Sequence, residues 1–234
     1  MKYIIQTGLG VALLLGTITV SAQQEVNALI KKVSAKIDQV NNYEANGKMK
    51  TNVTFLRVPE SVVKIYFKKP DKLKIKNEKG ISFVPKGAVS INLSNIINGG
   101  SYTAIDAGLE KIGNTTVRVV KLLPEDDNAD VVLSTVYIDE ANLVIKKAKT
   151  TTRENGSYQL EMTYGRYIAY GLPDKIIFTF NTKDYKLPKG VTFDFDDGSA
   201  VKKTTPAGVK KNQGMAEILF NSYIINKGVS DSVF

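Results

Sequence analysis

The sequence predicts a mainly β fold, with one large antiparallel sheet of about ten or eleven strands and only two helices. Three observations favour this fold. Apolar and polar residues alternate over most of the 234-residue chain, which is the period of a half-buried strand. Gly, Asn, Asp and Pro separate the alternating runs, where they favour tight turns. Helical spacing of apolar residues occurs in two segments only. A sheet this large curls, and its concave face has to be covered or filled.

The first 22 residues have the features of an export signal. Lys2 supplies a positive charge, an uncharged apolar run extends from Gly8 to Val20, and Val20-Ser21-Ala22 precedes Gln23. The apolar run is shorter than the roughly 20 residues of a transmembrane helix. We therefore expect cleavage after Ala22, with residues 23–234 forming one soluble domain in the periplasm. The alternative is an uncleaved membrane anchor.

Composition restricts the classes of function. The chain has no His and no Cys, so the commonest general base, the strongest nucleophile, disulfides and thiolate metal sites are all excluded. The 32 basic residues outnumber the 23 acidic ones, but they are spread along the strands, which favours solubility and a weak attraction to anionic membranes. No nucleic-acid motif accompanies this charge. We expect neither an enzyme nor a nucleic-acid-binding protein, and no cofactor.

Two acidic clusters are candidates for a metal site. Asp126, Asn128 and Asp130 match the start of a calcium loop, but Val131 stands where that loop requires Gly and Tyr137 where it requires Glu. The acids of the second cluster alternate with Phe, as the polar face of a strand does; they are Asp194, Asp196 and Asp197. We expect neither cluster to bind a metal.

An amphipathic helix is predicted from about Gln24 to Asn41. Its apolar residues recur at spacings of four and three, and they are Val26, Ile30, Val33, Ile37 and Val40. Lysines lie off this stripe. We expect the helix to cover one face of the sheet with its apolar side.

The period changes to two after the helix. The odd-numbered apolar residues of three successive strands each share one face, and they are Tyr43, Ala45, Met49, Val53 and Phe55, then Val63, Ile65 and Phe67, then Leu73 and Ile75. Pro70-Asp71 forms the turn before the third strand, whose polar face consists of Lys72, Lys74 and Lys76. A short strand from Ile81 to Val84 follows. A short helix is predicted from Asn92 to Gly100, because Leu93, Ile96 and Ile97 lie at helical spacing.

The second half is predicted to be a meander. Turn residues separate its runs, and Asn155-Gly156 is a strong hairpin signal. The predicted strands are 102–112, 117–123, 131–138, 143–151, 158–164, 176–180, 191–195 and 216–225. The inward side chains could pack solidly against the helices or could leave an apolar cavity, and the sequence leaves both alternatives open.

The order of these parts resembles the LolA-type outer-membrane lipoprotein carriers. Residues 67–75, which read Phe-Lys-Lys-Pro-Asp-Lys-Leu-Lys-Ile, look like the strand–turn–strand of this family, and segments 136–147, 164–173 and 220–226 also fit its pattern. The resemblance covers roughly residues 24–234. The frequent Ser-Asp-Gly hairpin of the family is absent here, and Lys69 stands where the best-known carriers have Arg.

The resemblance implies an unclosed β-barrel whose concave face holds acyl chains, with the helices as a lid. Carriers of this family take lipoproteins from an inner-membrane donor complex and give them to an outer-membrane acceptor. The expected ligand-binding residues are Met49, Val53, Phe55, Val63, Ile65, Phe67, Lys69, Leu73, Ile75, Leu93, Ile96 and Ile97. The basic residue at position 69 is expected to control cargo; the alternative is that Lys69 only reaches water at the barrel rim.

We therefore expect a monomeric periplasmic carrier of lipoprotein acyl chains or lipid, with no catalytic residue and no metal. Three alternatives stay open from the sequence. They are a LolA-like module that binds another lipid or senses envelope stress, a structural or protein-binding β-protein, and a hydrolase.

Overall fold

The structure is a computed structural model, and it describes residues 16–53, 56–57, 60–79, 101–154, 156–181 and 213–234. The predicted strand from Ile81 to Val84, the predicted helix from Asn92 to Gly100 and the predicted strand 191–195 lie outside these residues.

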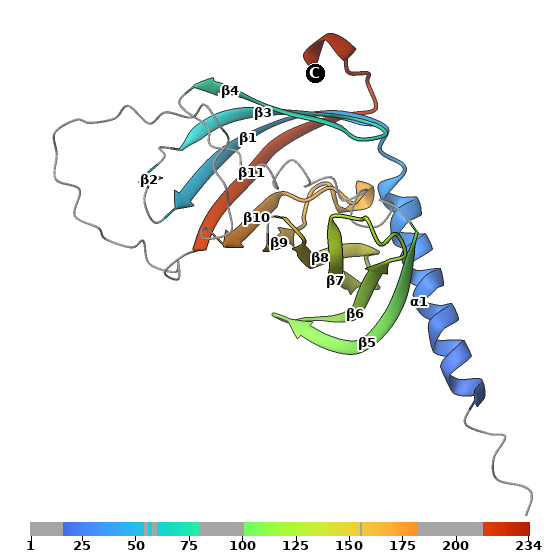
Figure 1. Ribbon diagram of the computed structural model, residues 1–234. Coiled ribbons are helices and arrows are strands. Elements are labelled where there is room, and N and C mark those ends of the chain that lie inside the picture. Colours follow the sequence, from blue (N-terminus) through green and yellow to red (C-terminus); the bar gives the residue numbers. More distant parts are fainter. Residues whose placement is uncertain (1–15, 54–55, 58–59, 80–100, 155, 182–212) are drawn as a thin grey trace, which may run out of the picture.

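One curved antiparallel sheet makes up the fold (Figure 1). Its strands follow the order β4-β3-β1-β11-β10-β9-β8-β7-β6-β5, and β2 pairs with β1. The strands are β1 (Asn42–Val53), β2 (Leu56–Arg57), β3 (Ser61–Lys68), β4 (Lys72–Lys79), β5 (Tyr102–Ile112), β6 (Thr115–Pro124), β7 (Val131–Asp139), β8 (Val144–Thr152), β9 (Ser157–Thr163), β10 (Lys175–Asn181) and β11 (Gln213–Ile225). In the described part of the chain the edge strands β4 and β5 are not paired with each other. The predicted open, mainly β barrel is confirmed.

A bulge in β11 keeps the inner face continuous. Gly47 of β1 lies opposite Phe220 and Asn46 lies opposite Ser222, so Asn221 is the extra residue. A Cβ atom at Gly47 would lie 2.6 Å from the Leu219 carbonyl oxygen, and this close approach of two backbones is why a residue without a side chain stands there. The bulge turns Tyr223 to the buried face, together with Phe220.

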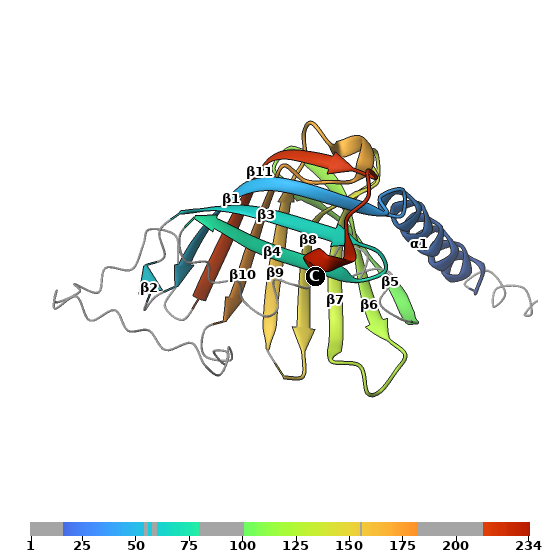
Figure 2. The same cartoon turned by 90° about the horizontal axis from the view of Figure 1, so that it is seen from above.

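The helix α1 (Gly16–Ile37) lies at one end of the curved sheet, next to β5 (Figures 1 and 2). The predicted apolar stripe is confirmed, because Val26, Ile30 and Val33 are buried in the same cluster as the inner face of the sheet. Two side chains attach the helix to the sheet. Gln23 Nε2 donates to the Ala104 carbonyl oxygen at 2.5 Å, and Lys36 Nζ donates to the Asn142 carbonyl oxygen at 2.6 Å.

The helix begins before the predicted Gln24, at Gly16, and it ends earlier than predicted, at Ile37 rather than near Asn41. Asn226, which follows β11, occupies the backbone groups that a further helical turn would use. Its Oδ1 accepts from the amide of Asn41 at 2.7 Å, and its Nδ2 donates to the Gln39 carbonyl oxygen at 2.8 Å. Val40 is still buried, because the chain turns there toward the sheet. No helix in the described residues is both long and apolar enough to cross a membrane.

Candidate functional site

The concave face of the sheet is an apolar surface built by strand alternation. Strand pairing sets Tyr43 opposite Phe67 and Ala45 opposite Ile65, and it then sets Phe67 opposite Leu73 and Ile65 opposite Ile75. The structure therefore brings together the predicted inward residues of β1, β3 and β4.

Burial falls from the middle of this face toward its β4 edge. Met49, Val63, Ile65 and Phe67 are buried, whereas Leu73 and Ile75 are half-buried against the same cluster. Phe55, Leu93, Ile96 and Ile97 lie outside the described residues, as does the side chain of Val53, the last residue of β1. Six of the apolar residues predicted to bind ligand thus share one surface, and their role in binding stays a prediction.

Aromatic side chains line one end of the concave face. The Tyr43 ring stacks on Phe67 with centroids 5.2 Å apart and meets Tyr223 edge-on at 5.3 Å. Tyr223 also stacks on Phe220 at 5.0 Å and meets the edge of Tyr167 at 4.9 Å. Such pairs are the offset and edge-on arrangements that aromatic rings prefer. They make this end of the face a rigid wall.

A second aromatic group lies toward the other end of the strands. Phe178 stacks on Phe180 with centroids 5.4 Å apart, and Tyr158 packs against Phe178 at 5.5 Å. Gly214 stands opposite Phe180, and a Cβ atom there would overlap the Phe180 ring. The glycine leaves the space that the ring fills.

The hydroxyl groups of two buried tyrosines find partners in the backbone. Tyr164 Oη donates to the Ile145 carbonyl oxygen at 2.8 Å, and Tyr223 Oη donates to the Pro173 carbonyl oxygen at 2.8 Å. Burial raises the pKa of Tyr43, Tyr164 and Tyr223 well above the ordinary value, because the charged phenolate would lose its hydration. These groups stay neutral at physiological pH and serve as apolar walls, and the hydroxyl groups of Tyr164 and Tyr223 are hydrogen-bonded.

Lys69 lies where β3 turns toward β4, at the end of the concave face. Its Nζ donates to the Asp38 carbonyl oxygen at 2.7 Å and forms an ion pair with Asp38 Oδ1 at 3.0 Å. The ammonium therefore lies at the C-terminal end of α1, where the helix dipole favours a positive charge. Its side chain is 29% exposed, so the charge reaches the rim as well as the helix. Control of the cargo by Lys69 stays a prediction.

No sequence pattern indicates Asp38 as the partner of Lys69. The two residues are separated by the whole of β1 and β3, and only the folded sheet brings them together. The position of Lys69, directly after a strand with an apolar inward face, indicates that its charge lies at the barrel rim. It does not indicate which residue pairs with that charge.

The connection between β9 and β10, which contains the short helix η2 (Ile168–Tyr170), clamps the same end of the molecule. Arg166 donates from Nη2 to the Phe220 carbonyl oxygen and from Nη1 to the Asn221 carbonyl oxygen, both at 2.8 Å. Gly171, with a φ of 67°, lies against the last turn of α1. The hydrogen bonds of Arg166 thus stabilise the bulge in β11, and Gly171 packs against the C-terminal end of α1.

Chemistry at a metal has no support from the described residues. In the described ranges no three His, Cys, Asp or Glu residues lie close enough to hold an ion. Asp126 of the first acidic cluster forms a turn instead, because its Oδ1 accepts from the Asn128 amide at 2.9 Å. Asp194, Asp196 and Asp197 lie outside the described residues.

Comparison of the sequence with protein-family models and with curated proteins gives no match. Solved structures do share the fold. An outer membrane lipoprotein-sorting protein domain from Vibrio parahaemolyticus has a TM-score of 0.57 at 11% identity, with 90% of this chain and 96% of that chain covered. A LolA superfamily protein from Nitrosomonas europaea has a TM-score of 0.56 at 11% identity, covering 89% of this chain and 96% of that one.

A DUF1329 family protein from Desulfovibrio piger is similar to the same extent, with a TM-score of 0.55, 12% identity and coverage of 89% and 96%. Identities this low show a common fold and nothing of activity. The expected resemblance is confirmed at that level: this chain has the fold of the LolA superfamily and of lipoprotein-sorting domains.

Proposed function

We propose that this protein is a periplasmic carrier that binds acyl chains of lipoproteins or lipids on its concave face and moves them from the inner to the outer membrane. The observation that supports this function best is the largely apolar inner face of an open sheet, which a separate helix covers at one end. The shared fold with a lipoprotein-sorting domain supports it further.

Ligand entry would require α1 to move. Three of its side chains, Val26, Ile30 and Val33, are buried against the inner face. Their burial contributes roughly 5–9 kcal/mol at about 1.5–3 kcal/mol per side chain. An acyl chain of about 14 methylene groups contributes about 11 kcal/mol when it replaces them, at about 0.8 kcal/mol per group. The difference, about 2–6 kcal/mol in favour of the acyl chain, corresponds to weak binding and is therefore compatible with reversible loading.

Polar contacts would set how strongly α1 is held against the sheet. The hydrogen bonds of Gln23, Lys36 and Lys69 join α1 to the sheet and to the β3–β4 turn. Each contributes only about 1 kcal/mol net, because water replaces it when it opens. Lys69 is the one among them that lies at the end of the concave face, and we assign it the role of controlling retention of the cargo.

The proposed activity is binding and transfer without catalysis. Moving an acyl chain between surfaces makes and breaks no covalent bond, and the chain has neither His nor Cys. Donor and acceptor complexes at the two membranes are part of the proposal. So is export, and N-terminal peptide mapping should find Gln23 as the first residue of the periplasmic protein; a first residue at Met1 or Lys2 would contradict it.

Native mass spectrometry of the protein released from the periplasm tests the proposal directly. We expect adducts with the mass of lipid or of a lipidated protein, and we expect organic extraction to remove them. The extracted protein should then take up a fluorescent fatty acid. A preparation that carries no lipid before extraction and takes up no fatty acid after it would refute the carrier function.

A second function, that of a structural β-protein, is favoured by one observation. The central inward residues Met49, Val63 and Ile65 are buried by neighbouring side chains of the same protein. A permanently filled core would show high stability together with no lipid uptake. The Phe67 variant discussed below separates these two functions.

A further inference from the structure

The convex side of β3 and β4 carries a ladder of lysines. Strand pairing sets Lys64 directly opposite Lys76 and Lys68 directly opposite Lys72, with Tyr66 opposite Lys74 between them. All of these side chains have the parity opposite to that of the buried Ile65 and Phe67. We name this surface the lysine face; it consists of Lys64, Lys68, Lys72, Lys74 and Lys76.

Such a ladder works against folding. Like charges directly opposite each other on neighbouring strands are destabilising, and the lysine face contains two such pairs. Lysines on an edge strand can be explained by protection against edge-to-edge association, which accounts for the lysines of β4. It does not account for Lys64 and Lys68, because β3 is an inner strand paired on both sides. The convex side of β3 and β4 therefore carries more positive charge than protection of the sheet edge requires.

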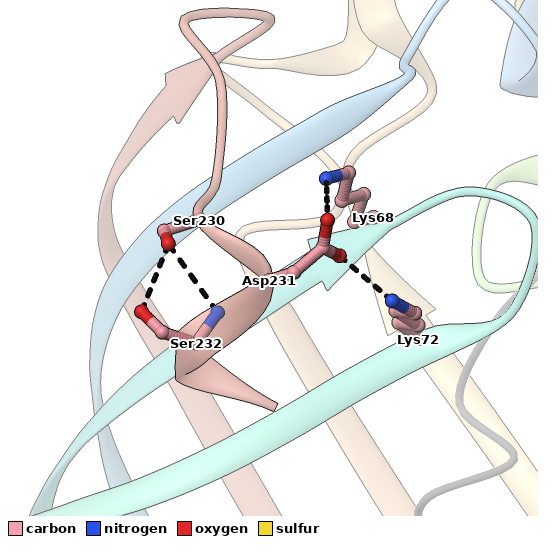
Figure 3. Close-up of polar contacts among 5 residues, drawn as sticks. All are labelled: Lys68, Lys72, Ser230, Asp231 and Ser232. Carbon is pink, nitrogen blue, oxygen red and sulfur yellow. Dashed lines mark hydrogen bonds and ion pairs between the residues drawn. The ribbon is translucent and has the colours of Figure 1, made fainter.

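The chain supplies a counter-charge of its own at each end of the ladder, two for the five lysines. At one end, Glu44 of β1 forms an ion pair with Lys64, with Oε1 and Nζ 3.8 Å apart. Asp231, in the short helix η3 (Asp231–Val233) near the C-terminus, accepts from Lys72 Nζ at 2.7 Å through Oδ1 and from Lys68 Nζ at 2.9 Å through Oδ2 (Figure 3). These two hydrogen bonds lower the pKa of Asp231 from 3.8 to about 2, and the one from Lys72 has the larger effect. Asp231 therefore stays ionised under physiological conditions.

The geometry of this contact is that of an anion bridging two ammonium groups with two oxygens. A lipid phosphate presents two such oxygens as well. Asp231 itself lies on a segment with few buried groups: its side chain is 63% exposed, and Ser230 Oγ caps the one-turn helix by accepting from the Ser232 amide at 3.3 Å (Figure 3). The carboxylate can leave without disturbing the core.

Aromatic rings lie beneath the same lysines. Lys76 Nζ lies 5.5 Å from the centre of the Tyr66 ring, and Lys72 Nζ lies 5.8 Å from that of Phe234. Lysines interleaved with aromatic side chains match the chemistry of a bilayer surface, where ammonium groups meet phosphates and rings lie at the level of the headgroups.

We propose that the lysine face docks this protein on the surface of an anionic membrane, and that Asp231 competes with lipid phosphates for Lys68 and Lys72. The proposal goes beyond the proposed carrier function, because docking uses the convex side and does not depend on acyl binding. It gives the C-terminal segment a role as an internal competitor that weakens docking until anionic lipid is present at high density.

Vesicle co-sedimentation tests docking. We expect binding to vesicles of phosphatidylglycerol and phosphatidylcholine, loss of this binding in salt, and none to phosphatidylcholine alone. Replacing Lys74 and Lys76 by Gln should weaken binding by about 25-fold, at about fivefold per lysine. The matched control replaces Lys121 and Lys149, two exposed lysines of the convex side on β6 and β8. An equal loss in the control would show diffuse attraction by net charge and would overturn the lysine face.

A second pair of variants tests the competitor. Asp231→Asn should strengthen binding to the anionic vesicles by about fivefold. Asp127→Asn removes the same charge from an exposed residue. The hydrogen bond between Arg153 and Asp127 uses the backbone carbonyl oxygen of Asp127, so the substitution keeps it and should change vesicle binding little. Equal effects of the two variants would overturn the role of Asp231.

Fatty-acid uptake from solution separates this inference from the carrier function. We expect all four variants to take up the probe as the wild type does. Failure of the wild type to take up the probe, with selective binding to anionic vesicles intact, would refute the carrier function and leave docking standing.

Discussion

Substitution of Phe67 by Ser decides whether the concave face is a binding surface or a closed core. The ring is only 4% exposed, stacks on Tyr43 and lies opposite Leu73. Deleting a buried phenyl ring costs about 3–5 kcal/mol of unfolding free energy, since both the transfer energy and the packing around the new cavity are lost. The serine hydroxyl adds to the cost unless it finds a hydrogen-bond partner.

Tyr137 provides the matched control. It is 5% exposed but faces the convex side of β7, in a separate small cluster with Val117 and Val119, and Lys147 Nζ lies 3.9 Å from the centre of its ring. Tyr137→Ser removes a buried ring of similar size, so we expect a similar loss of stability, about 3–5 kcal/mol. It leaves the concave face intact.

The assay is titration with a fluorescent fatty acid, compared at equal folded fraction as determined by urea unfolding. If the Phe67 ring contacts about two methylene groups of the ligand, its loss removes about 1.6 kcal/mol and weakens binding roughly tenfold. Tyr137→Ser should bind as the wild type does. Stability lost in both variants with affinity unchanged in both would refute the assignment of Phe67 to a binding surface.

Three further predictions test the contact between Lys69 and Asp38, the bulge and the buried tyrosines. Lys69→Leu removes the ammonium from the end of α1 and keeps apolar bulk, so transfer of a labelled acyl probe to acceptor vesicles should change in rate; equal rates at equal folded fraction would remove Lys69 from the mechanism. Gly47→Ala forces the backbones of β1 and β11 apart and should lower the unfolding free energy by about 1–3 kcal/mol in a urea titration; an unchanged midpoint would contradict the close approach. Because burial raises the pKa of Tyr43 and Tyr164 above 10.0, the unfolded chain loses protons that the folded chain keeps, and stability should be full below pH 10 and fall as the pH rises further. Exposed tyrosines such as Tyr170 can ionise in the folded protein, so the last part of the tyrosinate absorbance, that of the buried tyrosines, should appear together with loss of the near-ultraviolet circular dichroism. Tyrosinate absorbance from all 11 tyrosines in a protein that is still folded would contradict the burial.

Strand alternation made much of this fold predictable. The period of two is a local property, so the inward sides of Met49, Val63, Ile65 and Phe67 follow from sequence once a strand is assumed. The open shape of the sheet is not local, because it depends on which strands, here β4 and β5, stand at its edges. It was anticipated from a family resemblance rather than from the residues themselves.

The bulge in β11 shows where local pattern fails. Alternation counted from Ala216 through Phe220 would place Tyr223 on the convex side, but the extra residue Asn221 turns it inward. The bulge depends on the close approach of Gly47, which is remote in sequence. The end of α1 was missed for a similar reason, since the cap comes from Asn226.

The β3–β4 turn connects the two halves of the proposed mechanism. Lys68, Lys69 and Lys72 flank one tight turn, and alternation sends Lys69 to Asp38 at the end of α1 while the other two reach Asp231 on the convex side. The same few backbone residues carry both contacts, so a displacement of the turn changes both. We therefore expect Lys69→Leu and Asp231→Asn to be non-additive in the rate of probe release to anionic vesicles. The double variant should differ from the product of the single effects by at least about twofold, as for residues that share a structural unit. Simple multiplication of the single effects would show that membrane docking and release of the helix are independent events.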